Sequence, residues 1–365
     1  GDRPCVDLLN LNSLKTKRLW RSEAPYFERP VSILDANSGT LLTSRESQEE
    51  SPNYYIRNLK PVDQKRKKST GSPLTQITFF PHPYPQWKGI QKQQLRYKRA
   101  DGVDLTATLL LPPGYKKEDG PLPTFLWAYP AEFKSAAAAG QVSGSPYTFN
   151  RISYWTGAAF VTRGYAVLEN ASIPIIGEGK EEPNDTYVQQ LVASARAAID
   201  EGVRLGVVDS TKVGVGGHSY GAFMTANLLS HSTLFKAGIA RSGAYNRTLT
   251  PFGFQNEQRT YWQAPDVYNT MSPFMNADKM KTPLLLIHGE ADNNTGTYPI
   301  QSERYYNALK GMGATTKLVF FPYESHHYDA QESLLDMLYE MNSWLDKYVK
   351  NDTTLSKPAK AGSSN

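Results

Sequence analysis

Short stretches in which apolar and polar residues alternate dominate the first 85 residues of the chain. Residues 4–22 (PCVDLLNLNSLKTKRLWRS) alternate around a polar turn, and residues 39–47 and 53–59 repeat the pattern between turn residues. Alternation with a period of two is typical of β-strands. At about 40 residues a blade, this region would hold about two blades of a β-propeller, whereas a closed propeller has at least four. We therefore expect residues 1–85 to be the end of an incomplete propeller.

From about residue 90 onwards, predicted strands alternate with predicted helices. An Asp101-Gly102 turn joins two alternating flanks, as in a β-hairpin. Further strands are predicted at 123–130, 165–172, 212–217, 236–243, 283–292 and 317–325, and helices at 184–206, 222–232, 299–313 and 329–350. Because such alternation forms a parallel sheet covered on both faces, residues 86–350 are expected to form one doubly wound, mostly parallel α/β domain. The polar tail 351–365 is expected to be flexible.

Composition and charge narrow the class of protein. The 40 Lys and Arg against 35 Asp and Glu give a net charge of +5, which permits acidic substrates. The basic run 64–73 (QKRKKSTGSP) has no interleaved aromatic residues, and we interpret it as a solvated loop, not as a nucleic-acid site. The single cysteine, Cys5, excludes an internal disulfide framework and a cysteine-based zinc site. No apolar run reaches the roughly 18 residues of a membrane span, and neither a metal nor a cofactor is expected.

Residues 217–221 (GHSYG) match the pattern G-x-S-x-G of a nucleophile elbow. The match lies between a predicted strand and a predicted helix, which is the setting that this pattern needs. Small residues on either side of Ser219 let the strand and the helix pass closely through the turn and hold the serine in a strained, exposed conformation. A plain glycine-rich turn before a helix is the alternative. We predict that Ser219 is a nucleophile.

A serine hydroxyl reacts only when a base takes its proton, and in this arrangement the acid and then the histidine follow the serine along the chain. Asp292 ends the predicted strand 283–292, and Glu290, two residues earlier, is interpreted as a strand-end or turn residue. His326 and His327 both lie in the loop after the next strand. The other histidines are predicted to be structural: His82, His218, His231 and His288.

The predicted chemistry is acyl transfer. His326 takes the Ser219 proton and later gives it to the leaving amine, while Asp292 fixes the imidazole tautomer and stabilises the imidazolium. The tetrahedral oxyanion needs oriented donors, each worth about 3 kcal/mol. One is the backbone N–H of Tyr220. The hydroxyl of Tyr129, at the end of the strand 123–130, is a second candidate, although this tyrosine could equally cap a core strand.

Three motifs make the sequence specific enough to compare with a family. GGHSYGAF (216–223), LLIHGEADNN (285–294) and PYESHHYDAQES (322–333) resemble the C-terminal catalytic domain of the prolyl oligopeptidase family of serine peptidases. Segments 175–195 and 237–255 are similar to one branch, the glutamyl endopeptidases of plant chloroplasts and their bacterial relatives. The resemblance covers residues 75–350. It implies an α/β-hydrolase fold preceded by the last blades of an incomplete propeller. It also implies a location in the chloroplast stroma, although the first residues do not match a transit peptide, and a reducing soluble compartment is the alternative.

The resemblance also assigns roles residue by residue. It implies that Ser219 is the nucleophile, Asp292 the triad acid and His326 the base. It further implies that the hydroxyl of Tyr129 belongs to the oxyanion hole. The family usually has glycine after the catalytic histidine, whereas His327 stands there in this chain. His326 remains the base that the motif implies.

Cleavage after glutamate, which the branch implies, requires a cation in the pocket that receives the substrate side chain. An arginine suits a carboxylate because its planar fork donates two parallel hydrogen bonds. The segment GIARSGAYNRTL follows the strand next to the elbow, where the family builds this pocket. Arg247 is the candidate and Arg241 the reserve, and either could instead be a structural ion-pair partner. Asn293 and Asn294 are expected to hold the substrate backbone.

These observations predict a serine endopeptidase that cleaves peptides or unfolded proteins after glutamate through an acyl-enzyme. No nucleic acid and no membrane is expected as a partner, and the sequence makes no prediction of the oligomeric state. An acylaminoacyl peptidase or a carboxylesterase would carry the same elbow and triad and is the alternative. A non-catalytic interaction module is a third hypothesis, which intact Ser219, Asp292 and His326 disfavour.

Overall fold

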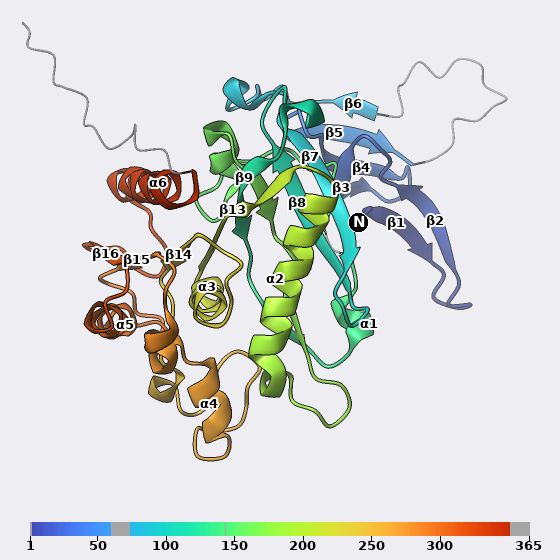
Figure 1. Ribbon diagram of the computed structural model, residues 1–365. Helices are drawn as coiled ribbons and strands as arrows, with labels where there is room; N and C mark the ends of the chain where they lie inside the picture. Colours follow the sequence, from blue (N-terminus) through green and yellow to red (C-terminus); the bar gives the residue numbers. More distant parts are fainter. Residues whose placement is uncertain (1, 60–73, 143, 351–365) are drawn as a thin grey trace, which may run out of the picture. The chain divides into compact units, whose positions relative to one another are not determined.

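The computed structural model describes residues 2–59, 74–142 and 144–350 and divides into two compact units (Figure 1). The first unit holds Gly1–Gln94 and Val142–Arg151, and the second holds Leu95–Gln141 and Ile152–Asn365. The basic run 64–73 and the tail 351–365 lie outside the described residues, so the expectations for them stay predictions. The domain boundary expected after residue 85 also stays a prediction.

The first unit is built from antiparallel strands. Its alternating sequence forms one hairpin, β1 with β2, and a four-stranded sheet in the order β3-β4-β5-β6. The bounds are β1 (Cys5–Leu9), β2 (Thr16–Arg21), β3 (Phe27–Asp35), β4 (Thr40–Glu46), β5 (Asn53–Asn58) and β6 (Leu74–Gln76). The strands that alternation predicts in residues 4–59 are therefore present.

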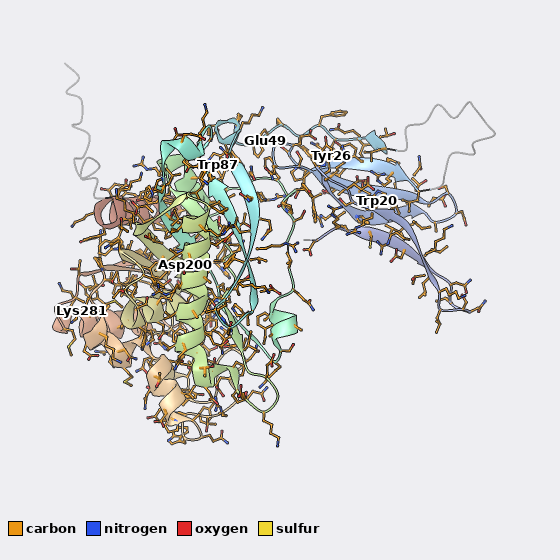
Figure 2. All side chains as sticks on the ribbon, turned by 45° about the vertical axis from the view of Figure 1, so that its right-hand side comes forward. Trp20, Tyr26, Glu49, Trp87, Asp200 and Lys281 are labelled. Atoms are coloured by element: carbon orange, nitrogen blue, oxygen red, sulfur yellow. The ribbon has the colours of Figure 1, made fainter. Side chains whose placement is uncertain are left out.

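A buried carboxylate links neighbouring strands of this sheet. Glu28 on β3 accepts hydrogen bonds from the Arg57 guanidinium on β5 at 2.6 and 2.7 Å and from Thr43 on β4 at 2.7 Å. The same guanidinium lies 4.8 Å from the ring centroid of Trp20 on β2. Trp20 is labelled in Figure 2. Because a buried charge is tolerated only when it is paired and hydrogen-bonded, these contacts explain how Glu28 can be buried.

The second unit contains an eight-stranded sheet in the order β16-β15-β14-β13-β9-β11-β8-β7. Strand β8 runs antiparallel to β11. The pairs β11 with β9, β9 with β13, β13 with β14, β14 with β15 and β15 with β16 are all parallel. The predicted mostly parallel sheet is therefore confirmed. The bounds are β7 (Gln91–Lys98), β8 (Asp104–Leu111), β9 (Leu122–Trp127), β11 (Ala166–Glu169), β13 (Val208–His218), β14 (Ala237–Arg241), β15 (Leu284–Gly289) and β16 (Thr316–Phe321). A separate parallel pair joins β10 (Ala131–Phe133) and β12 (Pro174–Ile176).

Helices cover both faces of the large sheet (Figure 1). Leu229 of α3 fills the space beside Gly238 of β14, and Leu345 of α6 fills the space beside Gly214 of β13. The strand register places these two glycines on opposite faces, because Gly238 pairs with Val215. The α-helices are α1 (Ala136–Ala139), α2 (Tyr187–Arg204), α3 (Tyr220–His231), α4 (Pro265–Met271), α5 (Ile300–Gly311) and α6 (Gln331–Leu345). The doubly wound arrangement is therefore confirmed.

Shorter helical segments connect these elements. The 3-10 helices are η1 (Pro85–Trp87), η2 (Lys117–Asp119), η3 (Ala158–Arg163), η4 (Pro183–Thr186), η5 (Arg247–Leu249) and η6 (Pro273–Lys279), and a π-helical turn, η7 (Asp346–Lys350), continues α6. The helix predicted over 329–350 is thus α-helical only as far as Leu345. None of the described helices has the length and apolar character that crossing a membrane requires.

Candidate active site

The chain makes a strained turn between β13 and α3, and Ser219 lies at its apex. Ser219 has φ 59° and ψ −116°, a conformation that costs a residue with a side chain about 1–3 kcal/mol. A Cβ added at Gly217 would lie 2.5 Å from backbone atoms of Gly221, and one added at Gly221 would lie 2.5 Å from the carbonyl oxygen of Ala128. The close approach of strand and helix therefore needs glycine on both sides of the serine, as the elbow pattern predicts.

Asp292 and His326 meet at the same edge of the sheet. Asp292 lies in the loop after β15 and His326 in the loop after β16, so both follow the carboxyl ends of parallel strands. His326 Nδ1 lies 2.8 Å from Asp292 Oδ2. Two further donors from the same loop hold the carboxylate: the Asn294 backbone N–H, 2.9 Å from Oδ1, and the Thr297 hydroxyl, 3.1 Å from Oδ2. Glu290, the other acidic residue of this loop, is exposed.

The electrostatic surroundings of Asp292 favour its ionised form. Burial raises the pKa of this carboxyl, but hydrogen bonds from His288, His326 and the Asn294 N–H outweigh burial and hold the pKa well below its ordinary value. Asp292 is therefore ionised at neutral pH, and its carboxylate can stabilise an imidazolium beside it.

His326 also lies beside the elbow. Its ring centroid is 4.8 Å from that of His218, the residue directly before Ser219. His327 is exposed and packs its ring 4.6 Å from the ring of Trp155, so the structure places His326, and not His327, against the acid. His218 is buried between these groups, and burial together with the charge of Arg241 lowers its pKa to about 2. His218 is therefore neutral.

Two tyrosines lie at the amino end of α3. Tyr220 is the first helical residue, and a backbone N–H at this position has no intrahelical acceptor. The Tyr220 hydroxyl donates to Glu132 Oε1 at 2.7 Å. Tyr129 follows β9 with an exposed side chain, and its ring centroid lies 5.9 Å from that of Tyr220. The Tyr220 N–H therefore lies at the elbow, where the helix amino end favours negative charge, and the ring of Tyr129 lies beside the ring of Tyr220.

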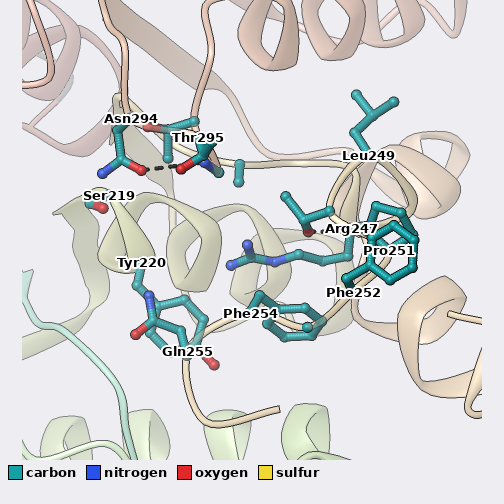
Figure 3. Close-up of a pocket in the computed structure, with 15 residues that line it drawn as sticks. Ser219, Tyr220, Arg247, Leu249, Pro251, Phe252, Phe254, Gln255, Asn294 and Thr295 are labelled. Atoms are coloured by element: carbon teal, nitrogen blue, oxygen red, sulfur yellow. Dashed lines mark hydrogen bonds between the residues drawn. The ribbon is translucent and has the colours of Figure 1, made fainter. Parts of the chain in front are cut away.

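A cavity of about 400 Å³ opens beside Ser219 (Figure 3). Arg247, the first residue of η5, lines it, and Figure 3 shows its guanidinium extended between Tyr220 and Phe254. Asn294 also lines the cavity, whereas Asn293 does not. Ser219, Arg247 and Asn294 are therefore predicted site residues that the structure brings around one space.

The guanidinium of Arg247 is held by aromatic rings. Its Cζ lies 4.2 Å from the ring centroid of Phe223, 4.4 Å from that of Phe254 and 5.6 Å from that of Tyr220. Burial lowers the pKa of Arg247, and the side chain is only 4% exposed. Its Nε has no hydrogen-bond acceptor, and no ion pair of Arg247 is present among the described residues. The Glu132 carboxylate raises the pKa of Arg247 but forms no ion pair with it, and a buried cation without an ion-pair partner favours an anionic ligand in this cavity.

Arg241, the reserve candidate, is placed elsewhere. Its side chain is fully buried, its Nη1 donates to the Tyr154 carbonyl at 2.7 Å, and its guanidinium lies 4.6 Å from the ring centroid of Trp127. It does not line the cavity that contains Ser219 and Arg247. The geometry therefore distinguishes two arginines that the sequence alone left as alternatives.

Sequence reasoning did not find several side chains that surround these groups. Thr297 bonds both members of the acid-histidine pair, since its hydroxyl also lies 3.1 Å from His326 Nδ1. Glu132 accepts the Tyr220 hydroxyl and the Asn256 N–H, and His288 contacts Asp292 from within β15. A threonine in a loop and a histidine in an apolar strand match no motif, so no pattern in one sequence points to them.

Comparisons with known proteins relate the chain to peptidases. Residues 177–352 match the family model described as the prolyl oligopeptidase family, and residues 101–249 match one described as X-Pro dipeptidyl-peptidase. The chain is 54% identical over 365 residues to the "Probable glutamyl endopeptidase, chloroplastic" of Arabidopsis thaliana, covering 97% of this chain and 37% of that protein. The protein of the same name from Oryza sativa subsp. japonica is 53% identical over 359 residues, with 95% and 37% covered. The chain thus spans well under half the length of these relatives.

A solved structure shows the same fold. The acylaminoacyl peptidase of Pyrococcus horikoshii superposes with a TM-score of 0.65 at 18% sequence identity, covering 94% of this chain and 53% of that one. At this identity the likeness concerns the fold alone. It supports the α/β-hydrolase architecture of the eight-stranded sheet and its helices, which the resemblance of the three motifs predicts.

Proposed function

Because the chain belongs to the prolyl oligopeptidase family of serine peptidases, we propose that it is an endopeptidase that hydrolyses peptide bonds after glutamate. The observation that carries this proposal is Arg247, a buried guanidinium without an ion pair, in the cavity that Ser219 also lines. The names of the plant relatives, glutamyl endopeptidase, agree with it. Peptides and unfolded proteins are the proposed substrates.

In the proposed reaction Ser219 Oγ attacks the carbonyl carbon of the scissile bond. The His326 imidazole, oriented through Nδ1 by Asp292, takes the hydroxyl proton on its other nitrogen. The negative charge that develops on the carbonyl oxygen is stabilised by the Tyr220 backbone N–H and the Tyr129 hydroxyl. The C–N bond then breaks, the amine leaves with the proton from His326, and an acyl-enzyme remains. Water attacks that ester by the same route and releases the carboxylic acid.

Specificity for glutamate follows from charge and burial. A substrate carboxylate in the cavity would give Arg247 an ion-pair partner at contact distance, which the described residues do not provide, in a place shielded from water by Phe223 and Phe254. Hydrogen bonds to charged groups contribute about 1.5–3 kcal/mol, and a buried donor left unpaired penalises other side chains. Glutamine has the same shape but no charge, so it is the informative competitor. Asn294, at the rim beside Asp292, is proposed to contact the substrate backbone.

The finer parts of the predicted architecture and setting belong to this proposal. A four-stranded antiparallel sheet and a further hairpin support the interpretation of residues 1–85 as the end of an incomplete β-propeller, followed by a catalytic domain over 86–350. The relatives are named chloroplastic, which supports a chloroplast location, with the stroma as the proposed compartment.

Two measurements on the full chain test the proposed function. A labelled fluorophosphonate is expected to modify Ser219 in the folded protein, and Ser219→Ala is expected to remove both labelling and peptide turnover. A peptide library with free and acetylated amino termini would then report the cleavage site. Cleavage after glutamate within both sets supports the endopeptidase. Release of only the acetylated first residue would instead favour an acylaminoacyl peptidase, and no labelling at Ser219 would remove the enzyme interpretation.

A further inference from the structure

The carboxylate of Asp292 touches two imidazoles. One belongs to His326, whose Nδ1 lies 2.8 Å from Oδ2. The other belongs to His288 in β15, four residues before the acid, whose Nε2 lies 2.9 Å from the same oxygen. His288 is completely buried, so it cannot reach substrate. The proposed reaction gives His288 no role, so its hydrogen bond to Asp292 needs a separate physical explanation.

The hydrogen-bond partners of His288 define its tautomer. A carboxylate only accepts hydrogen bonds, so Nε2 must carry a proton and donate it to Asp292. Nδ1 lies 2.6 Å from the hydroxyl of Ser302, a buried residue of α5. In the neutral imidazole Nδ1 is the acceptor, and the Ser302 hydroxyl donates to it. Ser302 therefore fixes which nitrogen of His288 faces the acid.

This arrangement gives the acid a fixed donor from the core of the sheet. Thr297 and the Asn294 N–H approach the carboxylate from its own loop, whereas His288 approaches from strand β15. A donor on a strand holds the carboxylate more rigidly than a donor on a loop. The hydrogen bond from His288 Nε2 also partly neutralises the negative charge of the Asp292 carboxylate. The carboxylate therefore attracts a proton on His326 less strongly.

We propose that His288 is a positioning residue of this peptidase, which orients the Asp292 carboxylate and limits the charge that this carboxylate presents to His326. The inference rests on the proposed function, because it assigns a role within the proposed Ser219–His326–Asp292 triad. The hydrogen-bonded series from the sheet core is Ser302, His288, Asp292 and His326.

Other titratable and charged groups also face this series. On the side of the elbow, His218 of β13 contacts His326, and Arg241 lies behind it. His327 lies next to His326 in its own loop. Tyr328 donates to the Ile287 carbonyl in β15, directly before His288. These four groups are unchanged in the variants of His288 described below, so a change in the pH profile reports on the substitution at His288.

Two variants of similar polarity test the role. His288→Gln places an amide nitrogen near the position of Nε2, where it can still donate to Asp292. His288→Asn places its amide near Nδ1, toward Ser302, and leaves the acid without this donor. We expect His288→Gln to keep kcat within about threefold of the wild type and His288→Asn to lower kcat about 10- to 100-fold with little change in KM.

The pH profile gives a readout that a merely structural role would not move. Without the Nε2–H donor, Asp292 attracts the imidazolium of His326 more strongly, so the base stays protonated to higher pH. The acid limb of kcat is therefore expected to move to higher pH in His288→Asn, by about half a unit or more, and to stay in place in His288→Gln. The limb position does not depend on how much of a variant folds.

His231 is a partly buried histidine at the end of α3, and its Nδ1 contacts the Asn227 carbonyl. The control variant is His231→Gln, which is expected to leave kcat and its pH profile unchanged.

Ser302→Ala supplies a second test that removes only a hydroxyl, and it is expected to lower kcat several-fold. The proposal is overturned if His288→Asn and Ser302→Ala both retain the wild-type limb and kcat. Fluorophosphonate labelling separates the two conclusions, because the proposed function fails only if the wild type itself is not labelled at Ser219.

Discussion

Arg247 is a cation that the fold packs against aromatic rings and that forms no ion pair with a described carboxylate. The rings of Phe223 and Phe254 each recover about 0.5–2 kcal/mol through cation–π contacts, whereas removing an ion from water costs several kcal/mol. The balance is unfavourable for the free protein and becomes favourable when an anion enters the cavity. At the scale of one residue, the buried charge of Arg247 lowers the stability of the free protein and strengthens the binding of an anionic side chain. Both effects can be measured in a variant that lacks the charge.

Replacing Arg247 by methionine removes the charge and keeps an unbranched side chain. We expect Arg247→Met to lower the ratio of kcat/KM for glutamate over glutamine peptides about 10- to 100-fold, because the charged hydrogen bonds are lost. We expect its Tm to equal or exceed that of the wild type, because the unpaired buried charge is gone. Arg247→Lys is the control, since it keeps the charge and loses the planar fork, and it should fall between the two. An unchanged preference for glutamate in the methionine variant would show that another group reads the side chain.

The sequence reveals some of these residues and not others for a physical reason. Ser219, Asp292 and His326 stand at the ends of strands that hydrophobic patterning predicts, so their common edge follows from the topology. Thr297 and His288 reach the acid only because the loop after β15 folds back and because β15 turns one side chain toward α5. Those contacts depend on three-dimensional packing, which no spacing along the chain encodes.

At the scale of elements, long periodic segments were predictable and short ones were not. The helices α2 and α5 lie within the ranges predicted from apolar spacing, and α3 begins at Tyr220, two residues before the predicted start at residue 222. Strand β13 begins at Val208, earlier than the predicted residue 212, because it pairs with β9 across a register shift between Val208 and Val213. The pair β10 and β12 was not predicted, since strands of three residues show no measurable alternation.

The elbow makes a prediction about how closely two elements must pass. A Cβ at Gly221 would lie 2.5 Å from the Ala128 carbonyl oxygen, so α3 or the end of β9 must shift to accept it. We expect Gly221→Ala to lower stability by about 1–3 kcal/mol and to reduce the rate of fluorophosphonate labelling at least tenfold. The matched control is Gly311→Ala at the end of α5, where no atom lies within 4 Å and alanine should be neutral or slightly stabilising. Equal labelling rates in both variants would contradict the steric account of the elbow.

At the scale of the whole molecule, both units expose large apolar side chains, but only the first unit exposes them on described strands. Each side chain assigned to the proposed site belongs to the second unit. The first unit exposes apolar residues on strands, including Leu8 at 58% on β1, and Ile33 at 66% and Leu34 at 53% on β3. Strand β3 is also an edge of its four-stranded sheet. No described strand pairs with the outer side of β3 in this sheet, and an apolar edge strand is a surface on which another chain can pair.

This exposure predicts self-association that is separate from catalysis. We expect the chain to form larger species as its concentration rises, and Ile33→Lys to shift that equilibrium toward monomer, because a charge on an edge strand opposes pairing. Light scattering after size exclusion measures the effect, and labelling of Ser219 should be the same in both proteins. Leu335→Lys is the matched control, since Leu335 is 59% exposed on α6, a helix whose backbone hydrogen bonds are internal. If Leu335→Lys reduces association as much as Ile33→Lys does, general surface charge and not the β3 edge is responsible.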